Sequence, residues 1–189
     1  MPDAGPGIRS VDGAAEAVAR GLPVKFLFFW GHRPRRDGTP GPGCLSQWWP
    51  AEFTEGGRVF ATAEHYMMAH KAWLFGEDDL AERVLAAPHP AQAKKLGREV
   101  RGFDEEVWAA HRYGIVVAAS RAKFGQHPEI RDFLLTTGAR VLVEASPLDR
   151  VWGIGLAADH EDAPRPDRWR GLNLLGFALM EARDGLRVC

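Results

Sequence analysis

The chain has 189 residues, of which 46% are hydrophobic and 26% are charged, and its formal net charge is −1. These values are typical of a globular protein with a buried core, and the length fits one domain. A charge so close to zero gives no overall electrostatic reason to bind nucleic acid or an anionic membrane. We expect a flexible segment at residues 1–22, which can form a short helix, followed by one domain at residues 23–189.

The ends of the chain and its two cysteines favour a cytoplasmic protein. The first thirteen residues, MPDAGPGIRSVDG, are rich in Gly and Pro and lack the apolar stretch of a signal peptide. No apolar run is long enough to span a bilayer. Cys44 and Cys189 make neither a disulfide framework nor a zinc motif. We therefore expect no membrane partner.

The segment that organises the rest is a helix expected at residues 62–75, TAEHYMMAHKAWLF. Thr62 is suited to cap its start, and Gly76 is suited to end it. Glu64 and Lys71 are seven residues apart, so they return to nearly the same face, about 10 Å apart along the axis. That is too far for the usual intrahelical ion pair, so both side chains can address one group bound between them. On helix statistics alone, the solvated face of an amphipathic helix is the favoured explanation.

Before this helix we expect one buried strand and a basic loop. The strand is residues 24–30, VKFLFFW, an apolar run with aromatic and β-branched members. It leads into residues 31–43, GHRPRRDGTPGPG, whose composition is typical of a loop. Arg33 in this loop can offer a guanidinium to a phosphate, although a solvated surface loop explains it at least as well. Residues 45–53 are expected to be extended or turned, and Gly56–Gly57 to make a tight hairpin.

Beyond residue 76, helices are expected to dominate. Apolar spacing and capping residues predict helices at residues 77–86, 91–99, 105–124, 128–135 and 174–183. A strand is expected at residues 140–144. The sequence therefore predicts a mainly α (α+β) fold: a compact single helical domain with a few short strands.

Two later segments carry side chains that are either structural or functional. In the helix at residues 105–124, Trp108 and Arg112 lie four apart on one face, where they can be core residues or one wall of a pocket. In the loop at residues 145–156, Asp149 and Trp152 can cover a sugar or a base, or can be a capping Asp and a packed Trp. Asn173 stands just before the last helix as its N-cap, as an amide that reads a ligand, or as both.

Several common kinds of site are not indicated. The string Gly153-Ile-Gly155-Leu-Ala-Ala158 has dinucleotide-fingerprint spacing, but no suitable strand precedes it and no helix can follow it. His65 and His70 are five residues apart, whereas the zinc-binding helix needs four. No phosphate-binding P-loop and no Gly-x-Ser-x-Gly elbow occurs. We expect no metal and no cofactor.

Eight motifs resemble the NADAR superfamily of YbiA-like N-glycosidases, which also occur fused to riboflavin-pathway enzymes. The motifs are GHRP (31–34), LSQWWP (45–50), F-x-T-x-EHYMMA-x-KA (60–72), AKKLGR (93–98), GFDEEVW (102–108), AKF-x-QHP (122–128), LVEASPLDRVWGIG (142–155) and W-x-GLNLLG-x-ALM (169–180). The resemblance covers Phe28 to Arg183, which is nearly the whole globular part. It departs from the family at Gln47, where members usually have Asn.

The resemblance implies a compact, mainly helical fold and cleavage of a C–N bond at the anomeric carbon of ribose. The first implied substrate class is the phosphoribosylated aminopyrimidines of riboflavin biosynthesis, which give ribose 5-phosphate and a base. A second class is ADP-ribose attached to guanine in DNA or nucleotides. A non-catalytic module that binds ADP-ribose or a nucleotide is the third possibility. The expected partner is a small molecule, and nucleic acid is a partner only in the second case.

With this chemistry, the expected catalytic residues are Glu64, Lys71 and Asp149. Glu64 is the first candidate for the carboxylate, and Asp149 would activate water or hold the ribose hydroxyls. Lys71 would bind phosphate, donate a proton or form a Schiff base with ring-opened ribose. We expect these three groups to converge on one anomeric centre. The expected substrate-binding residues are Arg33, Trp108, Arg112, Trp152 and Asn173.

Overall fold

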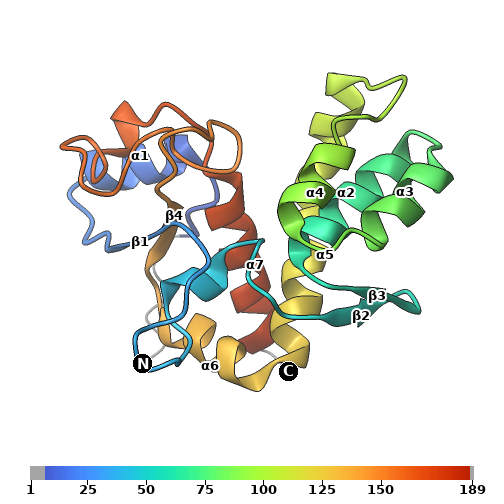
Figure 1. Ribbon diagram of the computed structural model, residues 1–189. Coiled ribbons are helices and arrows are strands. Elements are labelled where there is room, and N and C mark those ends of the chain that lie inside the picture. The colour runs from blue at the N-terminus through green and yellow to red at the C-terminus, as the bar shows by residue number, and fades with distance from the viewer. Residues whose placement is uncertain (1–6, 188–189) are drawn as a thin grey trace. The chain divides into compact units, whose positions relative to one another are not determined.

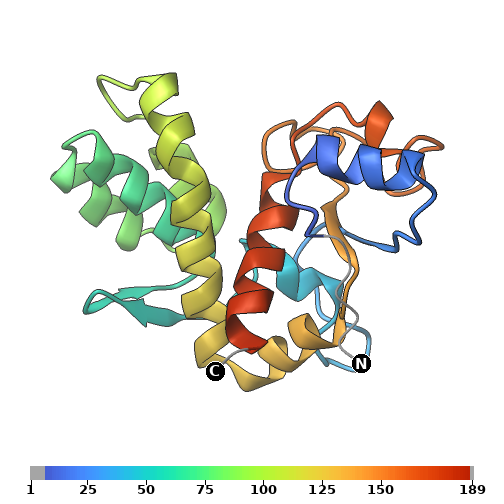
Figure 2. The ribbon, with the colours of Figure 1, turned by 180° about the vertical axis from the view of Figure 1, so that it is seen from behind.

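The computed structural model describes residues 7–187, which form two compact units (Figures 1 and 2). The continuous unit is residues 47–128, and the discontinuous unit is residues 7–46 together with 129–187. The flexibility expected of residues 1–6 lies outside the described part of the chain, and so does Cys189.

Helices dominate both units, so the expected mainly α (α+β) fold is confirmed. The helices are α1 (Val11–Ala19), α2 (Ala63–Leu74), α3 (Asp78–Leu85), α4 (Pro90–Leu96), α5 (Glu105–Gln126), α6 (Pro128–Thr136) and α7 (Leu174–Arg187). The strands are β1 (Phe26–Phe29), β2 (Phe53–Glu55), β3 (Arg58–Phe60) and β4 (Val141–Glu144), and two short 3-10 helices are η1 (Pro42–Leu45) and η2 (Pro166–Arg168). None of the helices formed by residues 7–187 has the length and apolar character that a bilayer crossing requires.

The discontinuous unit is built on a parallel pair of strands, β1 with β4, and α7 packs along β4 (Figure 2). The register places Phe26 opposite Val141 and Phe29 opposite Glu144. Of the β1 residues only Phe29 is fully buried, so the strand is less enclosed than its apolar sequence predicts. Because parallel strands end at the same edge of a sheet, the loops that follow β1 and β4 leave from one edge.

A buried arginine joins α7 to the chain that precedes β4. Arg183 is 3% exposed, and its Nη1 donates to Thr137 Oγ1 at 2.8 Å and to the Arg140 carbonyl oxygen at 2.9 Å. Burial lowers the pKa of Arg183 to about 10, a value at which the side chain is still charged at neutral pH. The sequence predicted that this helix ends at Arg183, but α7 continues to Arg187.

In the continuous unit, α2 is the buried helix, and it contacts α3, α4 and α5 (Figure 1). Thr62 caps α2 as predicted, because its hydroxyl accepts a hydrogen bond from the backbone N–H of His65. Every residue from Ala63 to Ala69 is buried, so this part of α2 is enclosed on all sides. The imidazole of His65 is bound at both ends, with Nδ1 2.8 Å from Thr62 Oγ1 and Nε2 3.0 Å from the Ala87 carbonyl oxygen.

The hairpin predicted at Gly56–Gly57 forms between β2 and β3. Both glycines have positive φ, +56° and +76°, which is the backbone of a two-residue type I′ turn and is unfavourable for other residues. The hairpin places Phe53 and Phe60 opposite each other, with ring centres 5.7 Å apart. Tyr66 of α2 completes the cluster, 4.7 Å from Phe60. This aromatic packing ties the hairpin to α2.

Candidate active site

The eight predicted site residues divide equally between the two units. The continuous unit holds Glu64, Lys71, Trp108 and Arg112, and the discontinuous unit holds Arg33, Asp149, Trp152 and Asn173. Within these sets, Lys71 lies over the Trp108 ring, and Asp149 accepts from the Trp152 N–H. The convergence of Asp149 with Glu64 and Lys71 stays a prediction.

Glu64 is buried in the first turn of α2. Its residue is 2% exposed, and its backbone N–H donates to the Gln47 carbonyl oxygen at 3.0 Å. The helix dipole favours a carboxylate at this end, but burial of a charge costs free energy, so such groups are rare outside functional sites. The alternative of an ordinary solvated face is wrong at Glu64.

Lys71 lies two turns further along α2 and is held by a carbonyl and two aromatic rings. Its Nζ donates to the Gly97 carbonyl oxygen at 2.9 Å and lies 4.2 Å from the centre of the Phe103 ring and 5.7 Å from that of Trp108. The backbone at position 97 can pack this closely against α2 only because Gly97 has no side chain: a Cβ there would lie 2.2 Å from the Met68 sulfur. Lys71 and Trp108, predicted separately, therefore belong to one cluster.

Burial is the main influence on the Lys71 ammonium group. It lowers the pKa of Lys71 below its usual range, the Glu105 carboxylate opposes this change, and Arg98 adds to it. An ammonium with a lowered pKa gives up its proton more readily than an exposed lysine does. Lys71 is therefore suited to proton donation, to anion binding or, when deprotonated, to attack on a carbonyl.

Arg112 and Glu105 form an ion pair on α5 that sequence reasoning missed. Arg112 Nη1 lies 2.9 Å from Glu105 Oε1, and the two side chains are 12% and 65% exposed. The Nε–H of Arg112 is buried and has no acceptor among residues 7–187. Since Glu105, Trp108 and Arg112 follow one another by three and four residues, they share a face of α5. That spacing is visible in the sequence, but it does not by itself distinguish a site from a solvated stripe.

Gln47 is a second residue whose role the sequence left unassigned. It is 7% exposed, and its Nε2 donates to the Met67 sulfur at 3.8 Å. Its Oε1 is buried and has no hydrogen-bond partner in the described part of the chain. A thioether is a weak acceptor, so the amide is only partly satisfied. The backbone carbonyl of Gln47 accepts from the Glu64 N–H, so Gln47 lies beside the buried carboxylate residue and is a candidate site residue.

In the discontinuous unit, the loop after β4 is ordered by Asp149. One carboxylate oxygen, Oδ1, accepts from the backbone N–H of Val151 at 2.9 Å and of Trp152 at 2.8 Å. The Ile154 N–H donates to the Glu144 carbonyl oxygen at 2.9 Å. This is the capping arrangement that the sequence offered as an alternative to substrate binding. It uses one carboxylate oxygen, so a role of Asp149 in catalysis stays a prediction.

Asn173 joins α7 to β4. It is fully buried and has a φ of +52°, and its Oδ1 accepts from the Glu144 N–H at 3.0 Å while its Nδ2 donates to the Leu142 carbonyl oxygen at 2.9 Å. The Asn173 carbonyl accepts from the Phe177 N–H, so the residue stands at the start of α7 as expected. Its amide is thus bonded to the strand, and ligand reading stays a prediction.

Arg33 lies in the loop after β1. Arg33 is exposed, and Trp30, which sequence reasoning passed over as a strand residue, is 64% exposed. An exposed indole offers a large apolar face with a polar N–H to a ligand or a partner. Trp30 therefore joins Arg33 as a candidate for contact with substrate.

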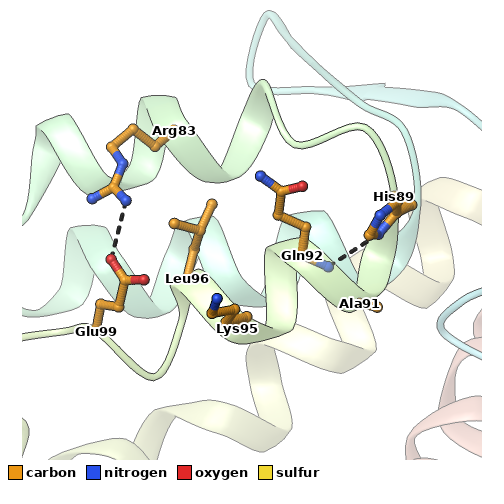
Figure 3. Close-up of a pocket in the computed structure, with 7 residues that line it drawn as sticks. All are labelled: Arg83, His89, Ala91, Gln92, Lys95, Leu96 and Glu99. Atoms are coloured by element: carbon orange, nitrogen blue, oxygen red, sulfur yellow. Dashed lines mark hydrogen bonds and ion pairs between the residues drawn. The ribbon is translucent and has the colours of Figure 1, made fainter.

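A surface pocket of about 510 Å³ lies between α3 and α4 in the continuous unit (Figure 3). Its lining is Arg83, His89, Ala91, Gln92, Lys95, Leu96 and Glu99. Arg83 and Glu99 are paired across it at 3.1 Å, and His89 Nδ1 accepts from the Gln92 backbone N–H (Figure 3). It contains no predicted site residue.

The NADAR domain family model matches residues 28–187, which include parts of both units. An N-glycosidase of Acanthamoeba polyphaga mimivirus is 41% identical over 165 residues, covering 85% of this chain and 95% of the viral protein. The chain belongs to the NADAR domain family.

Other relatives of this NADAR domain agree with that assignment. N-glycosidase YbiA of Escherichia coli is 31% identical over 140 residues, covering 74% of this chain and 78% of YbiA. The NMR structure of E. coli YbiA matches with a TM-score of 0.66 and 27% identity, covering 87% of this chain and 86% of that one. The riboflavin biosynthesis protein PYRR of Zea mays is 35% identical over 135 residues, which are 67% of this chain but only 20% of PYRR.

The recognition of the family from its motifs is therefore confirmed. The enzyme class, a hydrolase acting on N-glycosyl bonds, is confirmed by the names of the viral and bacterial relatives of this NADAR domain. Within residues 7–187, no three or more His, Cys, Asp or Glu side chains are grouped so that they could hold a metal ion. The charged predicted residues of the continuous unit are a buried carboxylate, Glu64, a half-buried ammonium, Lys71, and a guanidinium, Arg112.

Proposed function

We propose that this NADAR domain hydrolyses the C–N glycosidic bond of phosphoribosylated aminopyrimidines and releases ribose 5-phosphate and the base. The observation that carries the proposal is the burial of Glu64 at 2% exposure on the same helix as Lys71. The likeness of two thirds of the chain to part of a maize riboflavin biosynthesis protein supports this substrate class.

The chemistry assigns opposite tasks to the two groups of α2. Breaking the C–N bond leaves positive charge on the ribose C1 and ring oxygen, and an electron pair on the base nitrogen. The Glu64 carboxylate would stabilise that charge or take a proton from the attacking water. The Lys71 ammonium would give a proton to the departing base, and its lowered pKa favours this transfer. A Schiff base between Lys71 and ring-opened ribose is the alternative role of the lysine.

The groups on α5 would hold the substrate. The indole of Trp108 can stack on a pyrimidine, and a guanidinium binds phosphate through parallel N–H groups. Arg112 suits this task because its Nε–H is buried and lacks an acceptor in the described part of the chain. The substrate class thus matches the two kinds of group that α5 presents.

The resemblance to the family also implies substrate contacts by four further residues. Asp149 would activate water or hold the ribose hydroxyls, Trp152 would cover the sugar, and Arg33 would bind phosphate. The exposure of Arg33 favours a role in binding, because its guanidinium is open to solvent and can pair with a phosphate. Asn173 would either bind the substrate or hold β4 in place through its hydrogen bonds to Leu142 and Glu144.

The test compares two substrate classes side by side. Purified protein is incubated with a phosphoribosylated aminopyrimidine and, separately, with ADP-ribosylated guanine in a nucleotide and in DNA, and released base and sugar are identified by mass. We expect base and ribose 5-phosphate from the first class. Release from the second class alone would replace the proposal with de-ADP-ribosylation. Saturable binding without any product would leave a binding module.

A further inference from the structure

The ion pair between Glu105 and Arg112 combines a largely buried cation with an exposed anion. The Arg112 side chain is 12% exposed and the Glu105 side chain is 65% exposed, although their atoms approach to 2.9 Å. An ion pair with one solvated partner adds little to stability, because water and salt compete for the exposed group. The carboxylate can therefore leave Arg112 without disturbing the fold.

A guanidinium and a carboxylate usually meet through two parallel N–H groups, but this pair uses Nη1. The Nε–H of Arg112 is buried and has no acceptor in the described part of the chain. A buried donor without an acceptor is costly, so its presence indicates that another group supplies the acceptor. A phosphate can accept from Nε and from a terminal nitrogen together.

Glu105 also acts on the second cation of this region. Its carboxylate opposes the effect of burial on Lys71, so its charge is felt by the ammonium on α2 as well as by Arg112. Lys71 itself is held by the Gly97 carbonyl and lies over the Phe103 and Trp108 rings. The exposed Glu105 carboxylate thus interacts electrostatically with two partly buried cations, Arg112 and Lys71.

We propose that the Glu105 carboxylate occupies the place of a phosphate group on Arg112, and that the phosphate of the substrate displaces it. The inference rests on the proposed function only for the identity of the phosphate-bearing ligand. Displacement makes Glu105 a specificity residue. A phosphate competes for Arg112 through a larger charge and more acceptor atoms, whereas a neutral nucleoside has no group that can replace the carboxylate. Glu105 would therefore discriminate against substrates that lack phosphate.

The decisive variant is Glu105→Gln, and Glu106→Gln is its matched control. Glu106 is the next residue in the first turn of α5, and its carboxylate makes no ion pair with another described residue. Each substitution removes one negative charge from the same helix end. Only Glu105→Gln removes the group that competes for Arg112. Any effect shared by both variants therefore reports general charge, not displacement.

The experiment is calorimetric titration of the wild type and both variants with ribose 5-phosphate, and with ribose as the phosphate-free control. We expect Glu105→Gln to bind ribose 5-phosphate about three- to fivefold more tightly than the wild type, the scale of a partly exposed ion pair. Glu106→Gln should bind it like the wild type, and binding of ribose should be unchanged in all three proteins. Unfolding curves establish that the variants are folded.

Weaker or equal binding of ribose 5-phosphate by Glu105→Gln would overturn the inference, and weaker binding would mean that Glu105 positions Arg112. An equal gain in Glu106→Gln, or no binding of ribose 5-phosphate by any of the proteins, would overturn it too. Since these are binding measurements, they are independent of turnover. A protein that binds as expected but cleaves no N-glycoside would contradict the proposed function and leave this inference standing.

Discussion

The ammonium group of Lys71 lies 5.7 Å from the centre of the Trp108 ring. The two residues are far apart in the sequence, and the packing of α2 against α5 brings them together. The ring face favours a cation, whereas burial disfavours one, and burial lowers the pKa of Lys71. The lysine therefore loses its proton at a lower pH than a solvated lysine does.

The pH dependence of activity should reveal this lysine. If the charged form is required, kcat/KM falls as the pH rises through the lowered pKa of Lys71, that is, below the usual lysine value of about 10.4. Lys71→Arg keeps its charge throughout and should have lower activity but no alkaline decline. Lys71→Met should lose activity at every pH. A decline that is the same in Lys71→Arg and in the wild type would assign it to another group.

Asn173 should matter for stability more than for binding. Asn173→Ala leaves the buried Leu142 carbonyl and Glu144 N–H without their partners and places alanine at a φ of +52°. We expect a loss of about 3 kcal/mol or more in the free energy of unfolding, measured by urea titration. Asn173→Gly, which tolerates this φ, should lose less. An unchanged stability with a raised KM would instead support ligand reading.

Asp149 can be tested for chemistry separately from its turn. Asp149→Asn keeps an oxygen that accepts from the Val151 and Trp152 N–H groups, but it removes the charge. If the carboxylate acts on water, Asp149→Asn should fold normally and lose about 100-fold or more in kcat. Asp149→Ala should lose both the turn and activity. Near-normal turnover of Asp149→Asn would restrict this residue to ordering the loop.

The stability of the fold should decrease in acid because of His65. Burial lowers the pKa of His65, so the unfolded chain takes up a proton at a pH where the folded chain does not. The contribution of His65 is complete above its unfolded pKa of about 6.5 and is lost as the pH falls from there towards the lowered folded value. His70, whose pKa burial also lowers, adds an effect of the same sign.

The measurement is the free energy of unfolding by urea at about pH 7.5 and at about pH 5.5, on either side of the usual histidine pKa. His65→Asn should reduce the difference between the two values, whereas His111→Gln, at an exposed position on α5, should leave it unchanged. An equal acid loss in His65→Asn and the wild type would contradict the account of this residue.

Local signals in the sequence predicted much of the fold. Thr62 was identified as an N-cap, and its hydroxyl accepts a hydrogen bond from a backbone N–H at the start of α2. Caps and tight turns depend on a few neighbouring residues, so one sequence carries them. The end of α7 was predicted too early, and the last residue of the helix, Arg187, makes a long-range hydrogen bond to the Gly138 carbonyl oxygen.

The site was harder to predict for the same reason. Helical spacing placed Glu64 and Lys71 on one face, but a solvated face has the same spacing, and only the packing of α2 within its unit buries Glu64. The bonds of Asn173 require the position of β4, which is not apparent from the residues around it. Glu105 lies seven residues from Arg112, but its pairing depends on side-chain conformations that spacing alone does not define.

The most direct test of the central claim is the rate of base release by Glu64→Gln. Glutamine keeps the size of this buried side chain and removes its charge, and circular dichroism establishes that the variant is folded. We expect base release from a phosphoribosylated aminopyrimidine to fall by about 100-fold or more, while Glu106→Gln stays near the wild-type rate. A folded Glu64→Gln protein that releases base at a near-normal rate would contradict the assignment of Glu64 as the catalytic carboxylate.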